Sequence, residues 1–537
     1  MQILDRINNL IKIGVALSAE KDLPRLLEMI LVGAKAITNA DGGTIYTVQD
    51  DQTLKMEIVR TDSLDFAMGG TTGTEIPFEP IPMYDPDGNP LEHMVVTYSV
   101  LNDSTVNIAD AYETKGFDFS GTREFDQKTG YRSRSFLTVP MKNHESKIIG
   151  VLQLINAQDE ENDEIIPFSS ELQQLTEAIA SQAAIALTNR QLIDSLEQMF
   201  VALIRMLAKA IDKKSPHTGN HSRRVPVITM MLAKAASSTT SGPLKDFKMT
   251  DADIHELETA AWLHDCGKVS TPEYVVDKRT KLETIHDAIH EVGCRFEILR
   301  RDLEIKRLRQ LAKGGESADQ IDSDYQQRLA ELDDEQQFIE RANIGGEFMT
   351  DEDQARVREI GKRELIINGE QRPLLDEREL YNLTIAKGTL TPEERDVINK
   401  HVSLTISMLE SIPFPKHLEQ VPLYAGAHHE KINGSGYPRG LSGDQLPIQA
   451  RIMAIADIFE ALTNKRPYKP AKQLSETMKI LGFMRKDGEI DGDLLDLFIE
   501  QKLYLKYAHE YLDPEQIDEV NHSAIPGYGS KAGFGPP

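Results

Sequence analysis

Histidines followed by an acidic residue or by a second histidine recur in short segments far apart along the chain, and they constrain its fold more than any other feature. One segment reads HHEKINGSGYP and begins with His428 and His429, and another, WLHDCGK, holds His264 and Asp265. Imidazole and carboxylate groups together suit first-row transition metals and zinc. We therefore expect a fold that brings these distant segments around shared metal ions.

Three further segments carry candidate ligands of the same kind. They are SPHTGNHSRRV, with His217 and His221, LTPEERDVINKHV, which ends at His401, and IMAIADIFEALT, which contains Asp457. Helices of a bundle can direct such side chains into one core. Neighbouring side chains on a helix point about 100° apart, so Asp265 could bridge two ions while His264 binds one of them. A water activated between two ions is a nucleophile for phosphodiester hydrolysis.

A histidine taken alone is more often a hydrogen-bonded core residue than a metal ligand. His286 and His290, one helical turn apart, could form a separate metal clamp, and surface or packing roles are the alternative that we favour for them. The joint recurrence of the motifs, rather than any single residue, supports the metal centre. Core roles are the default for His255, His417, His509 and His522.

Residues 1–190 alternate between helix and strand signals. Apolar residues at helical spacing predict an amphipathic helix over residues 20–40. The runs TIYTV and LKMEIV predict one hairpin, and SFLTVPM and KIIGVLQLIN predict a second. Strand pairs between flanking helices indicate an α+β domain of a sensory type.

Residues 171–213 contain no helix breaker and predict one long connecting helix. Its apolar side chains follow alternating three- and four-residue steps, and Gln182 and Asn189 fill two further positions of this seam, where a polar residue can fix the register of a coiled coil. The pattern favours a signalling helix that pairs in a homodimer, and packing of the helix on its own domain is the alternative. The apolar positions are Leu172, Leu175, Ile179, Ala186, Ile193, Leu196, Phe200, Leu203 and Leu207.

Residues 200–515 read as an almost entirely helical domain. It contains a helical insert at about residues 291–390, in which charge-rich stretches flank Gly314 and Gly315, and we assign this insert a scaffold role and no chemistry. The last residues, 516–537, are rich in glycine and proline and are expected to be a disordered tail.

The composition limits the partners and the compartment. A formal net charge of −26 disfavours binding of DNA or RNA through a phosphate-neutralising surface. The two cysteines, Cys266 and Cys294, form no disulfide framework, which indicates a reducing compartment. The sequence contains no apolar run of the ~20 residues that a membrane helix needs. We therefore expect a cytoplasmic protein without membrane insertion.

The C-terminal motifs resemble those of the HD-GYP subgroup of HD-domain phosphohydrolases over roughly residues 200–510. HDCGK matches the family's HD-x-G-K, HHEKINGSGYP matches its HHE-x₂-(D/N)-G-x-GYP, and ARIMAIADIFEALTNKRPYK matches the stretch that follows. The resemblance implies an all-α metallohydrolase domain that hydrolyses the bacterial messenger cyclic di-GMP to linear pGpG or GMP. It also implies two divalent ions, iron or manganese, held by His221, His264, Asp265, His401, His428, His429 and Asp457.

The chain departs from the family pattern at two positions. Glu460 stands where the family often has aspartate. Members with a third ion use a glutamate four residues before the first histidine, where this chain has His217, so His217 is a candidate ligand of a third ion and two ions are the simpler expectation. His290 imitates the family position that we assign to His401, but the segment SLTISMLESIPFP after His401 matches the family better.

The substrate would carry two phosphodiesters, so we expect cationic side chains to bind it beside the metal ions. Asp265 and Lys268 are the expected catalytic residues, with Lys268 binding phosphate or assisting the leaving oxygen. A salt bridge at a helix end is the alternative role of Lys268. Arg466 and Lys469 are further candidates for binding phosphate.

By the same resemblance, Gly436 and Tyr437 line the substrate pocket. The tyrosine ring would be available to stack on guanine. A turn that only shapes the chain after the HHE motif is the alternative interpretation.

Residues 1–190 resemble a GAF domain. The likeness lies in FDQKTGY and in the arrangement TVPM, turn, IIGVLQLIN. In the fingerprint of the members that bind cyclic nucleotides, this chain keeps Asn156 and Phe168 but has Ala157 in place of lysine and Glu171-Leu172 in place of the acidic pair. The ligand of this domain therefore stays unidentified, and the resemblance implies a domain that regulates the hydrolase or only dimerises.

Two other functions stay open. One is an HD hydrolase that acts on a different nucleotide, such as cyclic GMP-AMP or a mononucleotide. The other is a catalytically weak receptor that binds cyclic di-GMP and reports it to a partner, for which Glu460 and the insert leave room. The GYP signature favours a cyclic dinucleotide, so we expect the phosphodiesterase.

Overall fold

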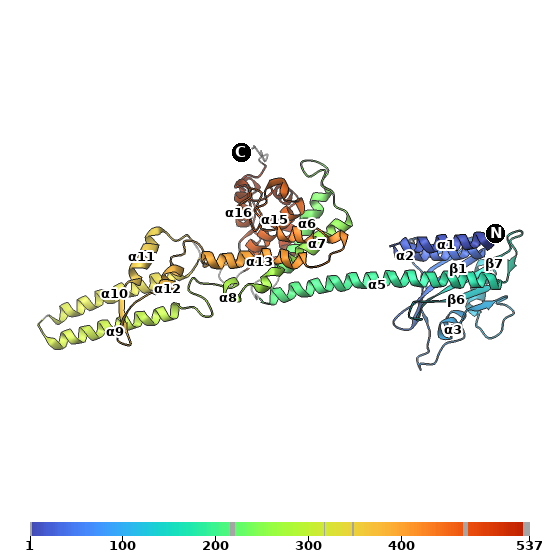
Figure 1. Cartoon of the computed structure of the whole chain (residues 1–537), viewed down its shortest axis with the longest axis horizontal. Coiled ribbons are helices and arrows are strands. Elements are labelled where there is room, and N and C mark those ends of the chain that lie inside the picture. Colours follow the sequence, from blue (N-terminus) through green and yellow to red (C-terminus); the bar gives the residue numbers. More distant parts are fainter. Residues whose placement is uncertain (1–2, 215–220, 316, 346–347, 466–470, 530–537) are drawn as a thin grey trace. The chain divides into compact units, whose positions relative to one another are not determined.

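Two compact units divide the chain, Met1–Met199 and Phe200–Pro537 (Figure 1). The computed structural model describes residues 3–214, 221–315, 317–345, 348–465 and 471–529. Three of the predicted site residues, His217, Arg466 and Lys469, lie outside these ranges. No helix within the described ranges combines the length and the apolar character that crossing a membrane requires.

An antiparallel sheet forms the centre of the first unit, with strands in the order β3-β2-β1-β7-β6-β5. The two predicted hairpins are present, because β1 pairs with β2 and β6 pairs with β7. The short strands β4 and β8 pair with β2 and β7. The strands are β1 (Ala40–Val48), β2 (Thr53–Thr61), β3 (Phe66–Gly69), β4 (Ile81–Pro82), β5 (Val106–Ile108), β6 (Phe136–Lys142), β7 (Ile148–Gln158) and β8 (Ile165–Ile166).

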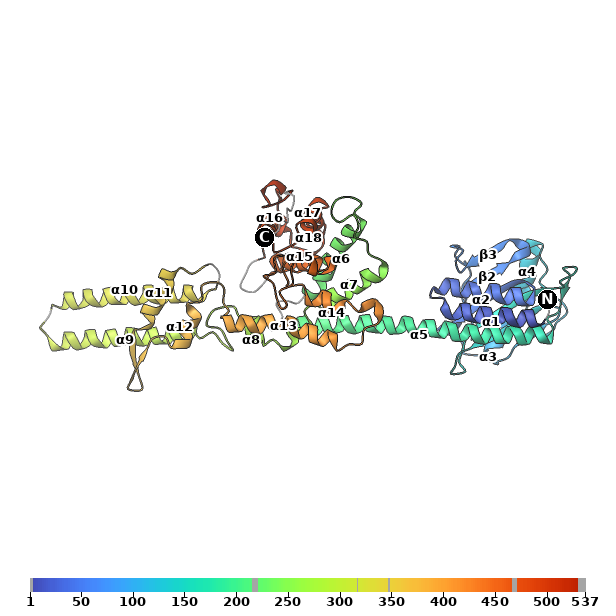
Figure 2. The ribbon, with the colours of Figure 1, turned by 45° about the horizontal axis from the view of Figure 1, so that its top comes forward.

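Three helices share a hydrophobic core with this sheet: α1 (Ile3–Ala19), α2 (Leu23–Thr38) and the first part of α5 (Ser170–Lys214) (Figure 2). Asp22 caps α2, since its side chain accepts a hydrogen bond from the backbone N–H of Arg25. The shorter helices α3 (Val95–Leu101) and α4 (Ser120–Thr129) complete the unit. The α+β prediction is therefore confirmed.

The predicted long helix is present as α5, but the first part of its predicted seam is wrong. Leu172 and Ile179 are buried, because the same apolar positions complete the core of the first unit. The later seam positions Ile193, Leu196, Leu203 and Leu207 are exposed.

The second unit is helical, as predicted, around one hydrophobic core. Leu232, Leu257 and Phe459 meet there from three different helices. Thr250 and Asp253 start the second of these helices with reciprocal hydrogen bonds, a capping box. The helices are α6 (His221–Ser238), α7 (Asp251–Leu263), α8 (Glu273–Val276), α13 (Pro392–Glu410), α14 (Val421–Gly426), α15 (Ile448–Thr463), α16 (Leu474–Lys486), α17 (Gly492–Glu500) and α18 (Leu503–Tyr511).

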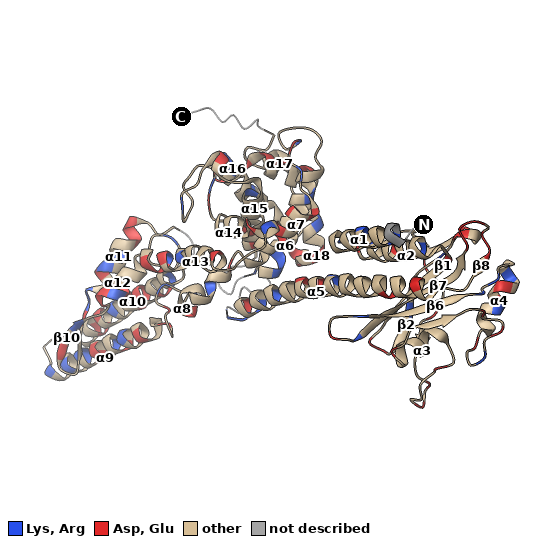
Figure 3. Cartoon of the chain, turned by 45° about the vertical axis from the view of Figure 1, so that its right-hand side comes forward, with Lys and Arg blue, Asp and Glu red and all other residues tan. Residues whose placement is uncertain are grey.

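A separate module is inserted between α8 and α13. Its helices α9 (Ile289–Lys313) and α10 (Ala318–Asn343) form the predicted hairpin and carry acidic and basic side chains along their length (Figure 3). Phe296, Ile339 and Leu374 belong to a core of its own. The rest of the module was not predicted, and it comprises α11 (Asp351–Gly361), β9 (Glu364–Ile367), β10 (Glu370–Pro373) and α12 (Glu377–Leu383).

The chain after α18 packs on the helical core, so the prediction of disorder from residue 516 is wrong as far as residue 529. Ile525 is buried in that core. Pro526 occupies a space that Gly482 leaves open, since a Cβ on Gly482 would lie 2.7 Å from Pro526 Cδ. A few apolar side chains among the glycines are sufficient to anchor this segment.

Candidate metal centre

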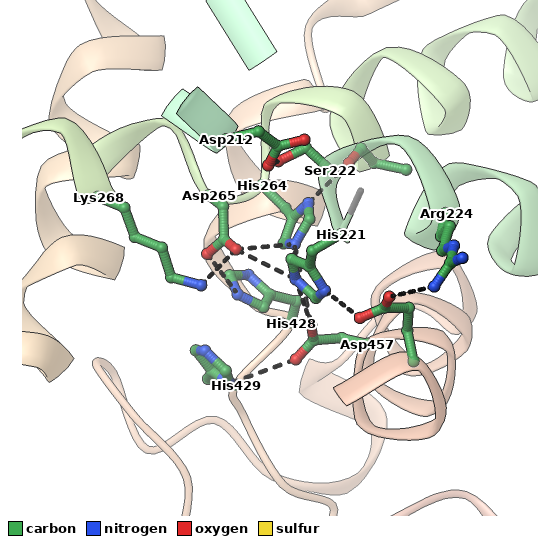
Figure 4. A network of polar contacts seen from close by, with 12 residues as sticks. Asp212, His221, Ser222, Arg224, His264, Asp265, Lys268, His428, His429 and Asp457 are labelled. Atoms are coloured by element: carbon green, nitrogen blue, oxygen red, sulfur yellow. Dashed lines mark hydrogen bonds and ion pairs between the residues drawn. The ribbon is translucent and has the colours of Figure 1, made fainter. Parts of the chain in front are cut away.

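Seven side chains that the sequence singled out come together in the second unit (Figure 4). The elements that carry them are fixed by the core of this unit, which is why residues so distant in sequence meet. His221 opens α6, His264 and Asp265 follow α7, His401 lies in α13, His428 and His429 follow α14, and Asp457 lies in α15.

Asp265 lies between two groups of histidines, and each of its oxygens faces one group. Its Oδ2 lies 3.3 Å from both His221 Nε2 and His264 Nε2. Its Oδ1 lies 3.2 Å from His401 Nε2 and 4.0 Å from His428 Nε2. This carboxylate is therefore placed to bridge two cations.

We call the two spaces position A and position B. Position A lies between His221, His264, Asp265 and Asp457, and position B lies between His401, His428, His429 and Asp265. Asp457 approaches position A more closely, because its Oδ1 lies 3.2 Å from His221 Nε2, whereas its Oδ2 lies 4.0 Å from His429 Nδ1.

The donor atoms fit two divalent ions. Ligands bound tetrahedrally at ~2.1 Å lie about 3.4 Å apart, and the His221 Nε2 and His264 Nε2 atoms are separated by 3.4 Å. Within the described part of the chain, Asp265 Oδ1, His401 Nε2 and His428 Nε2 are buried without a hydrogen-bond partner. Buried polar atoms seldom remain unpaired, and lone pairs that face one another repel unless a cation lies between them.

Backbone carbonyls orient three of the histidines. Nδ1 of His264 donates to Ala261 O at 2.7 Å, and Nδ1 of His428 donates to Ala425 O at 2.6 Å. His401 makes the same contact with the carbonyl three residues before it. Since a carbonyl only accepts, the proton must sit on Nδ1, which leaves the Nε2 lone pair free to bind a metal ion.

Three members of the cluster are held in the protonation states that bind metal ions, and His221 is the exception. Burial opposes protonation of His221, but Glu460 and Asp265 outweigh it and hold the pKa of His221 well above its ordinary value, so this imidazole must lose a proton when a metal ion binds. Burial lowers the pKa of His428 well below its ordinary value and lowers the pKa of His429 to about 4. Burial opposes ionisation of Asp265, but Lys268 and His264 outweigh it and hold the pKa of Asp265 well below its usual range. Neutral imidazoles and ionised carboxylates are the forms that bind metal ions.

Lys268 lies at the edge of the centre. Its Nζ lies 2.5 Å from Asp265 Oδ2, and its side chain is 26% exposed. The ammonium group is thus within reach of both the shared carboxylate and solvent. This position is compatible with the phosphate-binding role that the sequence predicted.

The GYP segment folds back over the histidine pair. The Tyr437 ring stacks on the His429 ring, with the ring centroids 4.9 Å apart and an interplanar angle of 27°. A Cβ on Gly436 would lie 2.4 Å from the backbone N of Lys431, so only glycine permits this close approach. Gly436 therefore has a packing function whether or not it also contacts a substrate.

Two acidic residues of the centre were not identified as functional from the sequence. Glu430 braces the GYP loop, since its carboxylate accepts hydrogen bonds from the backbone N–H groups of Arg439 and Leu441 at 2.7 and 3.0 Å. Glu460 is buried and contacts His221 Nδ1 through Oε2 at 2.5 Å. The helical spacing of Asp457 and Glu460 could have indicated that both face the same cluster.

Two histidines considered as alternatives lie outside the centre. His286 is exposed and pairs with Glu291 at 2.8 Å. His290 lies in α9 of the inserted module, whereas His401 contacts Asp265. The geometry therefore favours His401 as the residue that joins the cluster.

Comparison with known proteins agrees with this two-domain organisation. The GAF domain family matches residues 22–187, and the HD domain family matches residues 378–494. The chain therefore contains a GAF domain and an HD domain. The segment that matches the HD domain family begins after most of the inserted module and excludes His264 and Asp265. The fold nevertheless places Asp265 in contact with His401, which lies inside the matched segment.

Relatives whose names state an activity match part of the chain. The cyclic di-GMP phosphodiesterase of Thermotoga maritima is 31% identical over 156 residues, 28% of this chain and 40% of that protein. A probable cyclic di-GMP phosphodiesterase of Vibrio cholerae is 34% identical over 140 residues, 25% of this chain and 32% of that protein. The 3'3'-cGAMP-specific phosphodiesterase 1 of Vibrio cholerae is 45% identical over 76 residues, 14% and 18% of the two chains. The chain thus spans well under half the length of these relatives.

Proposed function

We propose that this protein is a metal-dependent phosphodiesterase that hydrolyses cyclic di-GMP to linear pGpG or GMP. The observation that carries the proposal is the placement of Asp265 between two groups of histidines. One of these groups, at positions 401, 428 and 429, lies in the segment that matches the HD domain family. Relatives that match part of the chain are named for hydrolysis of cyclic dinucleotides.

The chain's own residues have distinct roles in this proposal. Two bound divalent ions, iron or manganese, would supply Lewis acidity and activate the attacking water. Asp265 holds the two positions at a fixed separation, and Lys268 at the rim binds a phosphate oxygen of the substrate. The Tyr437 ring offers a face on which guanine stacks. The phosphate-binding roles of Arg466 and Lys469 remain predictions from the sequence.

The experiment that tests this function is turnover by the purified, metal-loaded protein. Protein loaded with Mn²⁺ or with Fe²⁺ under anaerobic conditions should convert cyclic di-GMP to pGpG or GMP, resolved by chromatography. The double substitution His264→Ala and Asp265→Ala should abolish product. Turnover retained by the double variant would refute the assignment, and tight binding of cyclic di-GMP with negligible turnover would favour the receptor alternative.

A second substrate, 3′3′-cyclic GMP-AMP, is favoured by one specific observation. The relative with 45% identity over its matched segment is named for that substrate. Both messengers present two 3′–5′ phosphodiesters to the same centre, so discrimination must come from contacts to the bases. Parallel assays with the two dinucleotides at equal concentration distinguish these alternatives.

We further propose that the GAF domain regulates the hydrolase and that α5 pairs with α5 of a second copy. The support is a stripe of exposed apolar side chains on α5 with alternating four- and three-residue steps, interrupted by the polar Asn189. The stripe consists of Ile185, Leu192, Leu196, Met199, Leu203 and Met206. An exposed apolar stripe of this spacing on a long helix is typical of a coiled-coil seam.

A further inference from the structure

We infer that the two metal positions differ in affinity and that position A binds its ion more tightly than position B. Glu460 is the positioning residue that raises the affinity of position A. The inference rests on the metal centre of the proposed function and goes beyond it. Hydrolysis by two ions does not require the two positions to differ in affinity.

The carboxylates are distributed unevenly around the two positions. Asp265 is shared, but Asp457 Oδ1 lies 3.2 Å from the metal-facing nitrogen of His221 and 3.9 Å from that of His264, both of position A. Among the described residues, the remaining groups at position B are the three imidazoles. A divalent cation at position A therefore faces more negative charge in a buried site, where Coulomb attraction is least screened.

The hydrogen-bond partners of the histidine Nδ1 atoms also favour tighter binding at position A. The histidines at 264, 401 and 428 donate Nδ1–H to neutral backbone carbonyls. His221 instead contacts the Glu460 carboxylate through Nδ1, at 2.5 Å. A carboxylate behind an imidazole fixes its tautomer, makes it a more basic ligand and strengthens metal binding. In the described part of the chain, the printed partners behind His401 and His428 of position B are carbonyls, whereas a carboxylate stands behind His221 of position A.

Arg224 and Lys268 are described cations near this arrangement. Arg224 Nη1 lies 4.0 Å from Glu460 Oε1, an ion pair without a hydrogen bond that offsets part of the carboxylate charge. Lys268 contacts Asp265, which the two positions share, so its charge acts on both positions. Glu460 itself is 1% exposed, and water therefore screens its charge little.

The length of the Glu460 side chain matters for this contact. Glu460 lies one turn after Asp457 on α15, and the position often holds aspartate in the family that the motifs resemble. An aspartate would retract the carboxylate by roughly one C–C bond, ~1.5 Å. That change would lengthen the 2.5 Å contact to His221 beyond a hydrogen bond.

The test is a metal titration that does not depend on catalysis. Full-length protein is stripped of metal with a chelator and titrated with Mn²⁺ by calorimetry, and bound metal is counted by mass spectrometry. The wild type should bind two ions in two steps that differ at least tenfold in affinity. Glu460→Gln should weaken the tighter step by roughly 10- to 100-fold and leave the weaker step unchanged.

Two further variants identify the steps. His429→Ala should remove the weaker step and leave the tighter one, because this histidine belongs to position B alone. Glu256→Gln is the matched control: Glu256 is a buried carboxylate whose Oε1 accepts the backbone N–H of Gln420 at 2.7 Å, and its replacement should leave both steps unchanged. If Glu460→Gln does not fold, Glu460→Asp serves as the second test and should weaken the same step.

Two equal steps in the wild type would overturn the inference, as would a Glu460 variant that titrates like the wild type. Loss of the same step in the Glu460 and His429 variants would also overturn it. The proposed function fails separately: unequal steps without turnover of cyclic dinucleotides would contradict the phosphodiesterase and leave the unequal positions standing.

Discussion

Gly267 and His401 meet backbone to backbone: a Cβ built on Gly267 would lie 2.0 Å from the carbonyl oxygen of His401. The backbone N–H of Gly267 also donates to Thr405 Oγ1 at 2.9 Å, on the same helix as His401. This close approach places Asp265, two residues earlier, against position B. The glycine of HDCGK therefore sets the distance between the bridging carboxylate and α13.

Gly267→Ala should separate these elements and lower the metal content. Inserting a methyl group into packed backbone costs about 1–3 kcal/mol, and the displaced Asp265 should bind the second ion more weakly. Thermal unfolding and the Mn²⁺:protein ratio after desalting are the measurements. Gly293→Ala is the control, because the Cβ there meets only Gln336 Nε2 at 3.9 Å; in mid-helix it should be neutral or stabilising. Equal metal content in the two variants would contradict the prediction.

Tyr437→Ala should weaken cyclic di-GMP binding. Stacking of a base on an aromatic side chain is worth about 1–3 kcal/mol, which corresponds to a rise in KM of roughly 5- to 150-fold. Tyr437→Phe retains the ring that lies on His429 and should keep KM near the wild-type value. Steady-state kinetics of the three proteins provide the comparison, and an unchanged KM in Tyr437→Ala would show that the ring does not bind the base.

Lys281 should make stability depend on pH in the alkaline range. Burial lowers the pKa of Lys281 to about 8, whereas an unfolded chain has a lysine pKa near 10.4. Between these values the unfolded state binds more protons than the folded state, so stability rises with pH. The wild type should gain up to about 3 kcal/mol relative to Lys281→Met between pH 8 and 10.5, measured by urea unfolding. Parallel pH curves for the two proteins would contradict this assignment.

Leu196→Glu should disrupt pairing of α5. This side chain is 59% exposed and lies in the middle of the apolar stripe, and a seam tolerates charge poorly. Light scattering after size exclusion should give a dimer mass for the wild type and a monomer mass for the variant. Gln198→Glu, exposed and two residues further along the helix, should remain dimeric. A monomeric wild type would end the dimer proposal.

The sequence was informative where residue type alone carries the chemistry. The HD and HHE motifs identified side chains that meet in space, because imidazoles and carboxylates at such spacing have few other common uses. The role of Glu460 could not be predicted from the sequence, because it depends on the contact of this carboxylate in α15 with His221 Nδ1 in α6. Glu430 was missed for the same reason, because its partners are backbone groups of a loop whose path is set by tertiary packing.

Apolar periodicity was ambiguous where one helix has two faces. Leu172 and Ile179 satisfy a heptad, yet they pack in the core of the first unit. The exposed stripe shares only its later positions, such as Leu196 and Leu203, with the predicted seam. The inserted module was underestimated, because the short elements after α10 have weak periodicity and owe their structure to a core assembled from distant segments. The roles of His217, Arg466 and Lys469 remain predictions, since these residues lie outside the described ranges.

Lys278 is buried and pairs with the partly exposed Glu394 at 2.7 Å, which joins the two ends of the inserted module at its base. Lys281 strengthens this junction by donating hydrogen bonds to Leu383 O and Ile385 O at 2.9 and 2.8 Å. Once the module has folded, only a short flexible segment separates Asp265 from His401. The entropy lost when two residues are brought together is smaller when the flexible segment between them is shorter. Assembly of the metal centre therefore does not depend on the length of the inserted module. Evolution could lengthen, shorten or exchange this module without changing the residues that bind the cations.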